Sequence, residues 1–475
     1  MFSRKHLNAI ETPKKLTKSK VGNNSSYLQP CMTLLTPLFL FSEWFVVLAA
    51  FFWVLRNSTW VHHIPFLAGL LLLHLFVGVA PLYFWFFGPF TILSYPYSAK
   101  FDKATGIYLV GIIAFIAGYS SLYFRKSKSV KIQLASYRSN CLAQRAIPAL
   151  LVFLIVCWIG VLLNFYLSGV NLAQVLNPSN RTPATMLFSI PIYNGFLESL
   201  ANSFISILLL LFAFSGKKAW VWLLIGFHVC FFFLAGWRFR IMVMLLGIAV
   251  YYLPQVSFKS IWKWSLAVSA GFLLMLWVSQ NRMAISKRMF HLVSFSISDY
   301  DTFRIVHEVG SCRTFMATLL FIKENSIAPD FGASFYLPIY WRFQPSSHFE
   351  GGVRPKPPLL ELEKAWIPKD VKQNLNPGVC NLEEYYLLLG WPGLIVLMAI
   401  FGLALHAIPK LRTTPLQTGA QVVYSAYLFQ FVSRGYLPQQ LKLLAFLSLP
   451  FLVLFILNKI HPELGHQSTQ HEHQA

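Results

Sequence analysis

Charged residues, and acidic ones above all, are scarce in this sequence. Of 475 residues, 17 are Asp or Glu and 39 are Lys or Arg, so 12% carry a charge while 56% are hydrophobic. Soluble globular domains have about 25% charged residues, so the composition excludes the soluble class. The apolar residues also occur in long runs, and about 20 of them cross the hydrocarbon layer of a bilayer. The sequence therefore predicts an integral membrane protein.

Cysteine is also rare. Six cysteines are too few for a disulfide scaffold in a chain of this length, and no Cys-x-x-Cys pair occurs among them. Cys312 and Cys380 share one polar segment, where a disulfide and two free thiols are the alternatives, and free thiols are favoured. No His or carboxylate set has the spacing of metal ligands, so neither a metal nor another cofactor is expected.

The apolar runs predict an all-α polytopic membrane protein with about eleven transmembrane helices, because backbone polar groups in lipid must bond within their own segment. The predicted spans are Pro37–Leu55, Pro65–Phe87, Thr105–Phe124, Ala146–Leu167, Leu200–Phe214, Ala219–Ala235, Ile241–Leu253, Ile261–Ser279, Leu389–Ile408, Gly419–Val432 and Leu441–Leu457. The expected parts are a basic cytoplasmic tail (1–31), a first transmembrane bundle (32–279), a long periplasmic loop (280–388), the last transmembrane helices (389–457) and a C-terminal tail (458–475).

Basic connectors set the orientation, because cytoplasmic loops are enriched in Lys and Arg. Residues 125–145 hold six basic residues and no acid, and from there on the connectors place residues 280–388 outside. The net charge of +22 follows from this rule, so nucleic-acid binding is not expected. The front of the chain conflicts with it, since three spans after a cytoplasmic tail would put 125–145 outside. A break is expected between Pro65 and Tyr97, such as a re-entrant hairpin around Pro81.

The long extracytoplasmic loop contains eleven of the 17 acids. For most of them a solvated loop is the simpler interpretation, and a functional site needs one or two. Within the loop, Asp299–Asn325 is predicted to be helical, because Cys312, Met316 and Leu320 recur at helical spacing. Such an amphipathic helix would lie along the membrane surface or cover a cavity.

Arginines beside apolar spans on the outer side indicate an anionic ligand. They are Arg181, Arg238, Arg240 and Arg434. Arginine near mid-membrane costs about 2.5–3.5 kcal/mol, and it usually faces a bundle interior or a polar cavity. Snorkelling to the interface is an equal alternative for Arg238 and Arg240. Phosphate suits such a site, because guanidinium binds it with two parallel hydrogen bonds.

Short motifs occur in a recognisable order along the chain. They are Thr36-Pro37-Leu38 with Phe41 and Trp44; Gly236-Trp237-Arg238; Asp330-Phe331-Gly332 with Tyr336, Arg342 and Arg354-Pro355-Lys356-Pro357; and Asn376-Pro377-Gly378 with Glu384-x-Tyr386-x3-Gly390-x2-Gly393. Together they resemble the oligosaccharide repeat-unit polymerases of bacterial inner membranes, the O-antigen polymerases of the Wzy type.

The resemblance implies a GT-C-like membrane glycosyltransferase on the outer face of the inner membrane. Its substrate would be undecaprenyl-pyrophosphate-linked oligosaccharide, which it would polymerise into O-antigen, capsule or exopolysaccharide, with a chain-length regulator and a flippase as partners. It also implies that Arg342, Arg354, Lys356 and Tyr386 bind pyrophosphate or glycan, together with the four outer arginines.

The acceptor hydroxyl in such a reaction needs a base. Glu384 is the first candidate, and the alternative is a carboxylate that only stabilises a helix N-terminus. His307 with Glu308 is the second candidate, and Glu361 or Glu363 the third. Gly390 and Gly393 are expected to serve close helix packing.

Two other functions fit parts of the pattern. A lipid-linked oligosaccharide ligase would share the architecture and the donor. A polysaccharide-precursor transporter or flippase belongs to a different class and would show inverted repeats and short loops, which the long acidic loop disfavours.

The orientation can be tested with single cysteines at Ser346 and Ser127, in a background without other accessible thiols. A membrane-impermeant maleimide applied to intact spheroplasts should label position 346 and spare position 127 until the membrane is opened. Labelling of both positions from one side would contradict the predicted topology.

Overall fold

The computed structural model describes most of the predicted spans. The described residues are 35–56, 63–87, 91–92, 95–96, 100–123, 140–167, 194–215, 218–234, 238–253, 311–326, 349, 379–407, 415–433 and 435–460. Their regular structure is helical apart from one antiparallel hairpin of two short strands. The all-α prediction is therefore confirmed for this part of the chain.

Each predicted span that falls within the described residues overlaps a helix. In chain order the elements are α1 (Leu35–Leu55), α2 (Ile64–His74), η3 (Leu75–Val79), α3 (Ala80–Phe87), β1 (Thr91–Ile92), β2 (Tyr95–Pro96), α4 (Phe101–Tyr123), α5 (Asn140–Leu167), α7 (Asn194–Ser215), α8 (Ala219–Leu234), α9 (Arg238–Tyr252), α12 (Ser311–Glu324), α15 (Asn381–Ala407), α16 (Pro415–Ser433) and α17 (Leu437–Ile460). Helix α15 begins at Asn381, before the predicted start at Leu389, and α12 lies within the segment predicted as the long loop. Six helical segments are long and apolar enough to cross a membrane. The predicted span Ile261–Ser279 lies outside the described residues, so the total of eleven stays a prediction.

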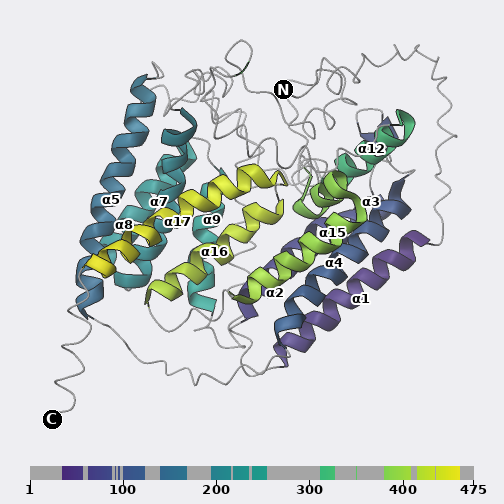
Figure 1. Ribbon diagram of the computed structural model, residues 1–475, viewed down its shortest axis with the longest axis horizontal. Coiled ribbons are helices and arrows are strands. Elements are labelled where there is room, and N and C mark those ends of the chain that lie inside the picture. The colour runs from purple at the N-terminus through teal and green to yellow at the C-terminus, as the bar shows by residue number, and fades with distance from the viewer. Residues whose placement is uncertain are drawn as a thin grey trace, which may run out of the picture.

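The helices form two groups, each around its own apolar core (Figure 1). Residues of α1 to α4, α12 and α15 build the first core, and residues of α5, α7, α8, α9 and α17 build the second. Helix α16 joins them, because Leu428 and Val432 belong to the first core while Val423 and Tyr427 belong to the second.

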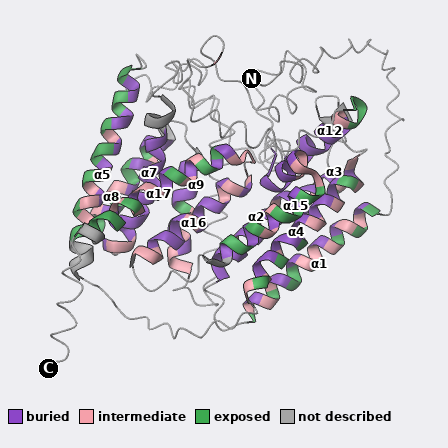
Figure 2. Cartoon of the chain, in the orientation of Figure 1, coloured by how far each residue is buried: buried purple, intermediate pink, exposed green. Residues whose placement is uncertain are grey.

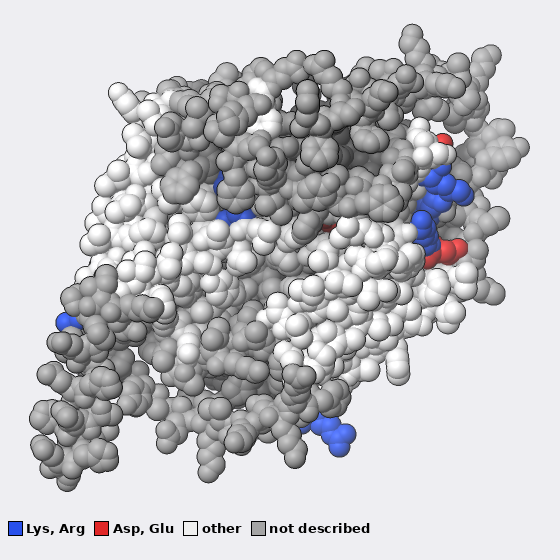
Figure 3. All heavy atoms as spheres, viewed as in Figure 1, with Lys and Arg blue, Asp and Glu red and all other residues white. Residues whose placement is uncertain are grey.

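Large apolar side chains cover the outward sides of the helices. Phe41 and Phe45 of α1 and Val152 and Ile159 of α5 are all more than half exposed, and Figure 2 shows exposed residues along both helices. Figure 3 shows a broad uncharged band across the described surface, with charged side chains toward its borders. Water-soluble proteins rarely expose such a surface, and together with the spanning helices it indicates a multi-pass membrane protein.

The closest helix pair is α4 with α15. A Cβ atom on Gly118 of α4 would lie 2.0 Å from the carbonyl oxygen of Ala399. A Cβ atom on Gly402 of α15 would lie 2.1 Å from the carbonyl oxygen of Phe115. Small residues let backbones approach in this way in membrane helices. The two glycines thus fix the distance between the helices that carry the polar site described below.

The predicted re-entrant hairpin around Pro81 is wrong. Residues Ile64–Phe86 form one apolar helical segment, in which η3 is a π-helical turn. A buried pair of an imidazole and a carboxyl group lies against this turn: His74 Nδ1 is 2.9 Å from Glu43 Oε1. A Cβ atom on Gly78 would lie 2.4 Å from Glu43 Oε2 and 2.5 Å from His74 Nδ1, so glycine makes room for the pair.

The start of α1 lies beside the start of α4, because Thr36 donates a hydrogen bond to Asp102 in the first turn of α4. Helix α15 begins at this end too, since Tyr108 of α4 contacts Glu383. Helix α4 therefore ends at the opposite end, where the basic connector 125–145 begins. The first three helices alternate regularly, so the predicted break between Pro65 and Tyr97 is absent from the described residues. The basic tail lies outside them, and its cytoplasmic location stays a prediction. Because α1 begins at the end opposite to the connector 125–145, the conflict between the two basic segments remains.

The helix predicted for Asp299–Asn325 is confirmed over Ser311–Glu324, which form α12. Residues Ser311–Leu320 are all buried, including the polar side chains of Arg313, Thr314 and Thr318. The amphipathic surface helix is thus a wrong prediction for this segment. Helix α12 packs on α4, η3 and β1.

The α4–α15 contact can be tested by alanine substitution. Overpacking of a tight site costs about 1–3 kcal/mol, so Gly402→Ala should lower the thermal unfolding midpoint of the protein purified in detergent. Gly226→Ala is the matched control, since nothing lies within 4 Å of a Cβ atom there and alanine favours the helix. Equal midpoints for the two variants would contradict the close contact.

Candidate active site

Two adjacent acidic residues, Glu383 and Glu384, lie in the first turn of helix α15, and both are buried. Glu383 Oε2 accepts the backbone N–H of Cys380 at 2.7 Å, which satisfies one of the free donors at the helix start. Glu383 Oε1 accepts the hydroxyl of Tyr108 at 2.6 Å. Glu383 therefore caps the N-terminus of its own helix and also links that helix to α4 by a hydrogen bond.

The second carboxylate binds a different helix. Glu384 Oε2 accepts the backbone N–H of Tyr436 at 2.6 Å, and Oε1 accepts that of Leu437 at 2.9 Å. Leu437 is the first residue of α17, so the negative charge lies at the positive end of that helix. The predicted alternative, a carboxylate at a helix N-terminus, thus has a direct structural basis, with α17 as the partner helix.

The turn before α17 is shaped around Glu384. Gly435 donates its N–H to the carbonyl oxygen of Val379 at 2.7 Å, and Tyr436 has φ of 92°. This is the left-handed region that residues with a side chain rarely adopt. Such a conformation persists where its surroundings hold it, and here the two N–H groups on Glu384 do so.

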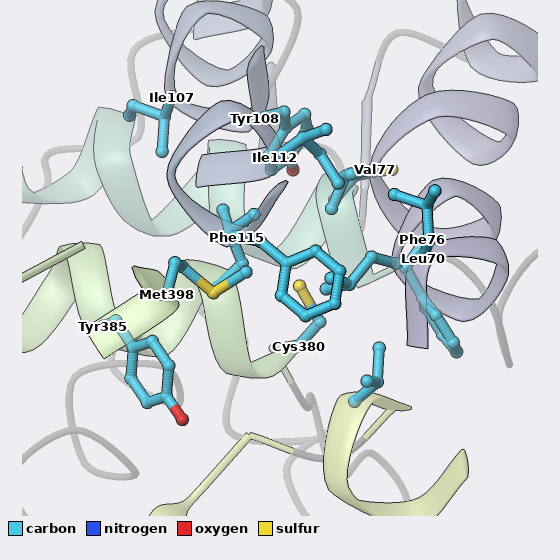
Figure 4. Close-up of a cluster of buried hydrophobic side chains, with 14 of the residues drawn as sticks. Leu70, Phe76, Val77, Ile107, Tyr108, Ile112, Phe115, Cys380, Tyr385 and Met398 are labelled. Carbon is cyan, nitrogen blue, oxygen red and sulfur yellow. The ribbon is translucent and has the colours of Figure 1, made fainter. Parts of the chain in front are cut away.

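The carboxylates stand beside a tyrosine-lined region. The hydroxyl of Tyr427 donates to the backbone oxygen of Gln440 at 2.7 Å. Figure 4 shows Tyr108, Phe115, Cys380 and Met398 in the apolar cluster, while the hydroxyl of Tyr385 points away from it. The apolar cluster thus covers one side of the α15 start, and polar groups of α16 and α17 lie on the other.

Cys312 and Cys380 are free and buried, so the favoured alternative of two thiols is confirmed. Burial raises the pKa of both thiols. Since the thiolate is the reactive form, neither thiol has the properties of a nucleophile or a metal ligand at neutral pH. Within the described residues no three His, Cys, Asp or Glu side chains gather as a metal site would need.

Among the described residues, Glu384 accepts hydrogen bonds from the N–H groups of Tyr436 and Leu437. A carboxylate has about four lone-pair positions, so these two donors occupy part of its capacity. They would favour the ionised form of the carboxyl group. In its ionised form, a carboxylate at this end of a span would meet the chemical requirement for a base.

Other predicted site residues lie around or apart from this centre. Tyr386 is half-buried, with its ring 5.3 Å from that of Trp391 and 6.1 Å from that of Phe315.

Arg240 is buried between α9 and α7, where its Nε donates to Asn202 Oδ1 at 2.8 Å, so it faces the bundle and does not snorkel. Arg238 opens α9, and its side chain is not described. Outside the described residues lie His307, Glu308, Arg181, Arg342, Arg354, Lys356 and Arg434, and also Glu361 and Glu363.

Gly390 differs from its prediction. It has φ of 64° and ψ of −153° and bends α15 just before Pro392. The nearest atom to a Cβ there is Pro392 Cδ at 4.0 Å. Gly390 is thus required for the backbone bend, and it does not pack against another helix as predicted.

Sequence reasoning missed Glu383 as a site residue, although it named the neighbouring Glu384. Its partner Tyr108 lies far away along the chain and inside a predicted apolar span. The available signal was the pair of adjacent acids at the start of a span, where each carboxylate needs a separate partner.

The comparisons with known proteins support the resemblance over the C-terminal part. Residues 372–461 match the family described as O-antigen polysaccharide polymerase Wzy. This region contains Glu383, Glu384, Tyr386 and helices α15 to α17. No curated protein and no solved structure matches the chain. The family resemblance is therefore confirmed for residues 372–461.

The link between Tyr108 and Glu383 can be measured with a double-mutant cycle. Tyr108→Phe removes the hydrogen bond to the carboxyl group of Glu383. Such a bond contributes about 0.5–3 kcal/mol, with the upper part of the range for an ionised carboxyl, so the change should lower the free energy of unfolding. In a Glu383→Gln background the same change should cost less, because the carboxyl group is gone. Denaturant unfolding of the four purified proteins would give the coupling energy, and strictly additive losses would contradict the contact.

Proposed function

We propose that this protein is a membrane glycosyltransferase that polymerises lipid-pyrophosphate-linked oligosaccharide units into a surface polysaccharide. The observation that carries the proposal is the family match over residues 372–461. The matched region includes Glu384 and Tyr386, which lie in the first two turns of α15. The active end would lie at the outer face of the bacterial inner membrane. A flippase and a chain-length regulator would work beside it.

The reaction needs a leaving group, an acceptor and a base. The acceptor sugar hydroxyl attacks C1 of the sugar that is linked to the lipid pyrophosphate. A C–O bond forms, the bond from C1 to the phosphate oxygen breaks, and the pyrophosphate leaves with the bonding electrons. The acceptor proton passes to a carboxylate. Arginines of the long loop would stabilise the charge that develops on the pyrophosphate.

Glu384 is the carboxylate that we assign as the base. It is fixed by the N–H groups of Tyr436 and Leu437, which hold it in one orientation while it keeps acceptor capacity. Glu383 and Tyr108 would position the same helix start. The outer arginines Arg181, Arg238 and Arg434, with Arg342, Arg354 and Lys356, remain the proposed ligands of the pyrophosphate.

A ligase would use the same donor but transfer the glycan to another lipid-anchored acceptor. The products separate the two functions, because a polymerase produces a ladder of chain lengths and a ligase changes the carrier of a chain. A flippase would form no glycosidic bond.

The role of Glu384 is tested by Glu384→Gln, which keeps the size and most hydrogen bonding but removes the base. A general base contributes about 10²–10⁴-fold to rate, whereas a helix-terminal charge contributes about 0.3–1 kcal/mol to stability. Cells that carry only this variant should show surface glycan with single repeat units in place of the ladder, at normal amounts of membrane protein.

The matched control is Glu463→Gln, which makes the same change in the C-terminal tail 458–475. That variant should keep the ladder. A full ladder from Glu384→Gln would remove Glu384 from the mechanism and leave His307 with Glu308 as the next candidates.

A further inference from the structure

Three lysines meet at the outer end of the first helix group, and we call them the lysine cluster: Lys100, Lys103 and Lys323. Lys100 directly precedes α4, Lys103 lies in its first turn, and Lys323 lies in the last turn of α12. Burial lowers the pKa of Lys100, and the charge of Lys323 and then that of Lys103 lower it further. The fold thus holds like charges together although they repel each other.

Nearby carboxylates do not balance this charge. Glu324 attracts Lys100, but it is the weakest of the influences that act on it. Asp102 accepts the hydroxyl of Thr36. The three lysines with these two acids therefore keep a net positive charge. Figure 3 shows basic and acidic side chains together at the right edge of the described surface, where α12 and α3 end in Figure 1.

Aromatic rings border the lysine cluster. The Nζ atom of Lys103 lies 5.6 Å from the centre of the Tyr386 ring. Tyr386 in turn contacts Trp391, which is 42% exposed and stands beside the bend at Gly390. A cation above aromatic rings that are partly exposed suits a ligand with both a phosphate and a sugar or isoprenoid part.

The depth in the membrane fits a lipid headgroup. Lys100 and Lys103 lie at the start of the span Phe101–Leu122, and Tyr386 lies in the second turn of the span Asn381–Leu405. Tyrosine prefers the interfacial level of the membrane, and Trp391 follows it after the bend at Gly390. Membrane proteins usually carry their excess of lysine and arginine on the cytoplasmic side. The lysine cluster lies at the end that adjoins the long loop, so the rule does not explain why lysines occur there.

We propose that the lysine cluster, with Tyr386 and Trp391, binds the phosphate groups of a membrane-embedded lipid phosphate ester at the lateral edge of the protein. On the proposed function, on which the identity of the lipid rests, this is the pyrophosphate of the lipid-linked oligosaccharide as it enters from the bilayer between α4, α12 and α15. The cluster consists of other residues than the loop arginines, and it would hold the substrate before reaction.

Direct binding tests the proposal. The full-length protein is placed in nanodiscs of neutral phosphatidylcholine, and binding of radiolabelled undecaprenyl pyrophosphate is measured. The triple variant K100Q/K103Q/K323Q should bind at least about ten-fold more weakly than the wild type, as expected when charged hydrogen bonds are lost. The triple Arg variant K100R/K103R/K323R should bind like the wild type, because it keeps the charge. Undecaprenol, which lacks phosphate, should not compete.

The matched control is K217Q/K218Q/K410Q, which removes three lysines from connectors assigned to the cytoplasmic side. It should bind like the wild type, and a loss equal to that of the first triple variant would overturn the proposal. Unchanged binding by K100Q/K103Q/K323Q would overturn it as well. Competition by a few molecules of phosphatidylglycerol per disc would show a site for bulk anionic headgroups and overturn the assignment to the isoprenoid ester.

A polymerisation assay on the same samples separates the two proposals. If the wild type makes polymer and K100Q/K103Q/K323Q makes it with an unchanged KM, the lysine cluster is not an entry site while the proposed function stands. If the wild type binds the probe but makes no polymer, the binding site stands and the proposed function fails.

Discussion

The start of α15 is the constraint on which the arrangement of α4, α15 and α17 depends. Glu383 and Glu384 are adjacent, yet they point to different partners: the hydroxyl of Tyr108 on α4 and the first backbone N–H groups of α17. A buried carboxylate is costly unless it is hydrogen-bonded, so each acid keeps its partner helix in place. The close contact of α4 and α15 at Gly118 and Gly402 lets both links form at once. The positions of α4, α15 and α17 relative to one another therefore depend on the same two acids. The motif that begins at Glu384 is held in a defined position by these contacts.

Periodicity and length were sufficient to predict where the helices lie. Uninterrupted apolar runs require helices in lipid, and α1, α4, α5, α15 and α17 formed as expected. The same reasoning failed for Pro65–Tyr97, where Pro81 suggested a turn. Helix α2 continues through the π-turn η3 instead, because Glu43 and His74 fill the site beside Gly78. A pair between two separate spans leaves no periodic signal in a single sequence.

In the candidate site too, residues of one short motif could be predicted from the sequence, whereas contacts between distant helices could not. Glu384 and Tyr386 could be named because they belong to one short motif, and the match over residues 372–461 supports that motif. Glu383 with Tyr108, and the lysine cluster with Tyr386, depend on contacts between α4, α12 and α15. Helix α12 was expected at the surface, but it is buried and packs on α4, η3 and β1. Its burial brings Lys323 to Lys100, so the cluster could not have been predicted from spacing along the chain.

The central claim is that this multi-pass protein forms glycosidic bonds between lipid-linked oligosaccharides. The most direct measurement uses the purified protein in liposomes with a single lipid-linked repeat unit as substrate. The account predicts a ladder of glycan lengths in which each new linkage releases one molecule of lipid pyrophosphate. Release of lipid pyrophosphate without longer glycans, or movement of the substrate across the bilayer without any new linkage, would contradict it.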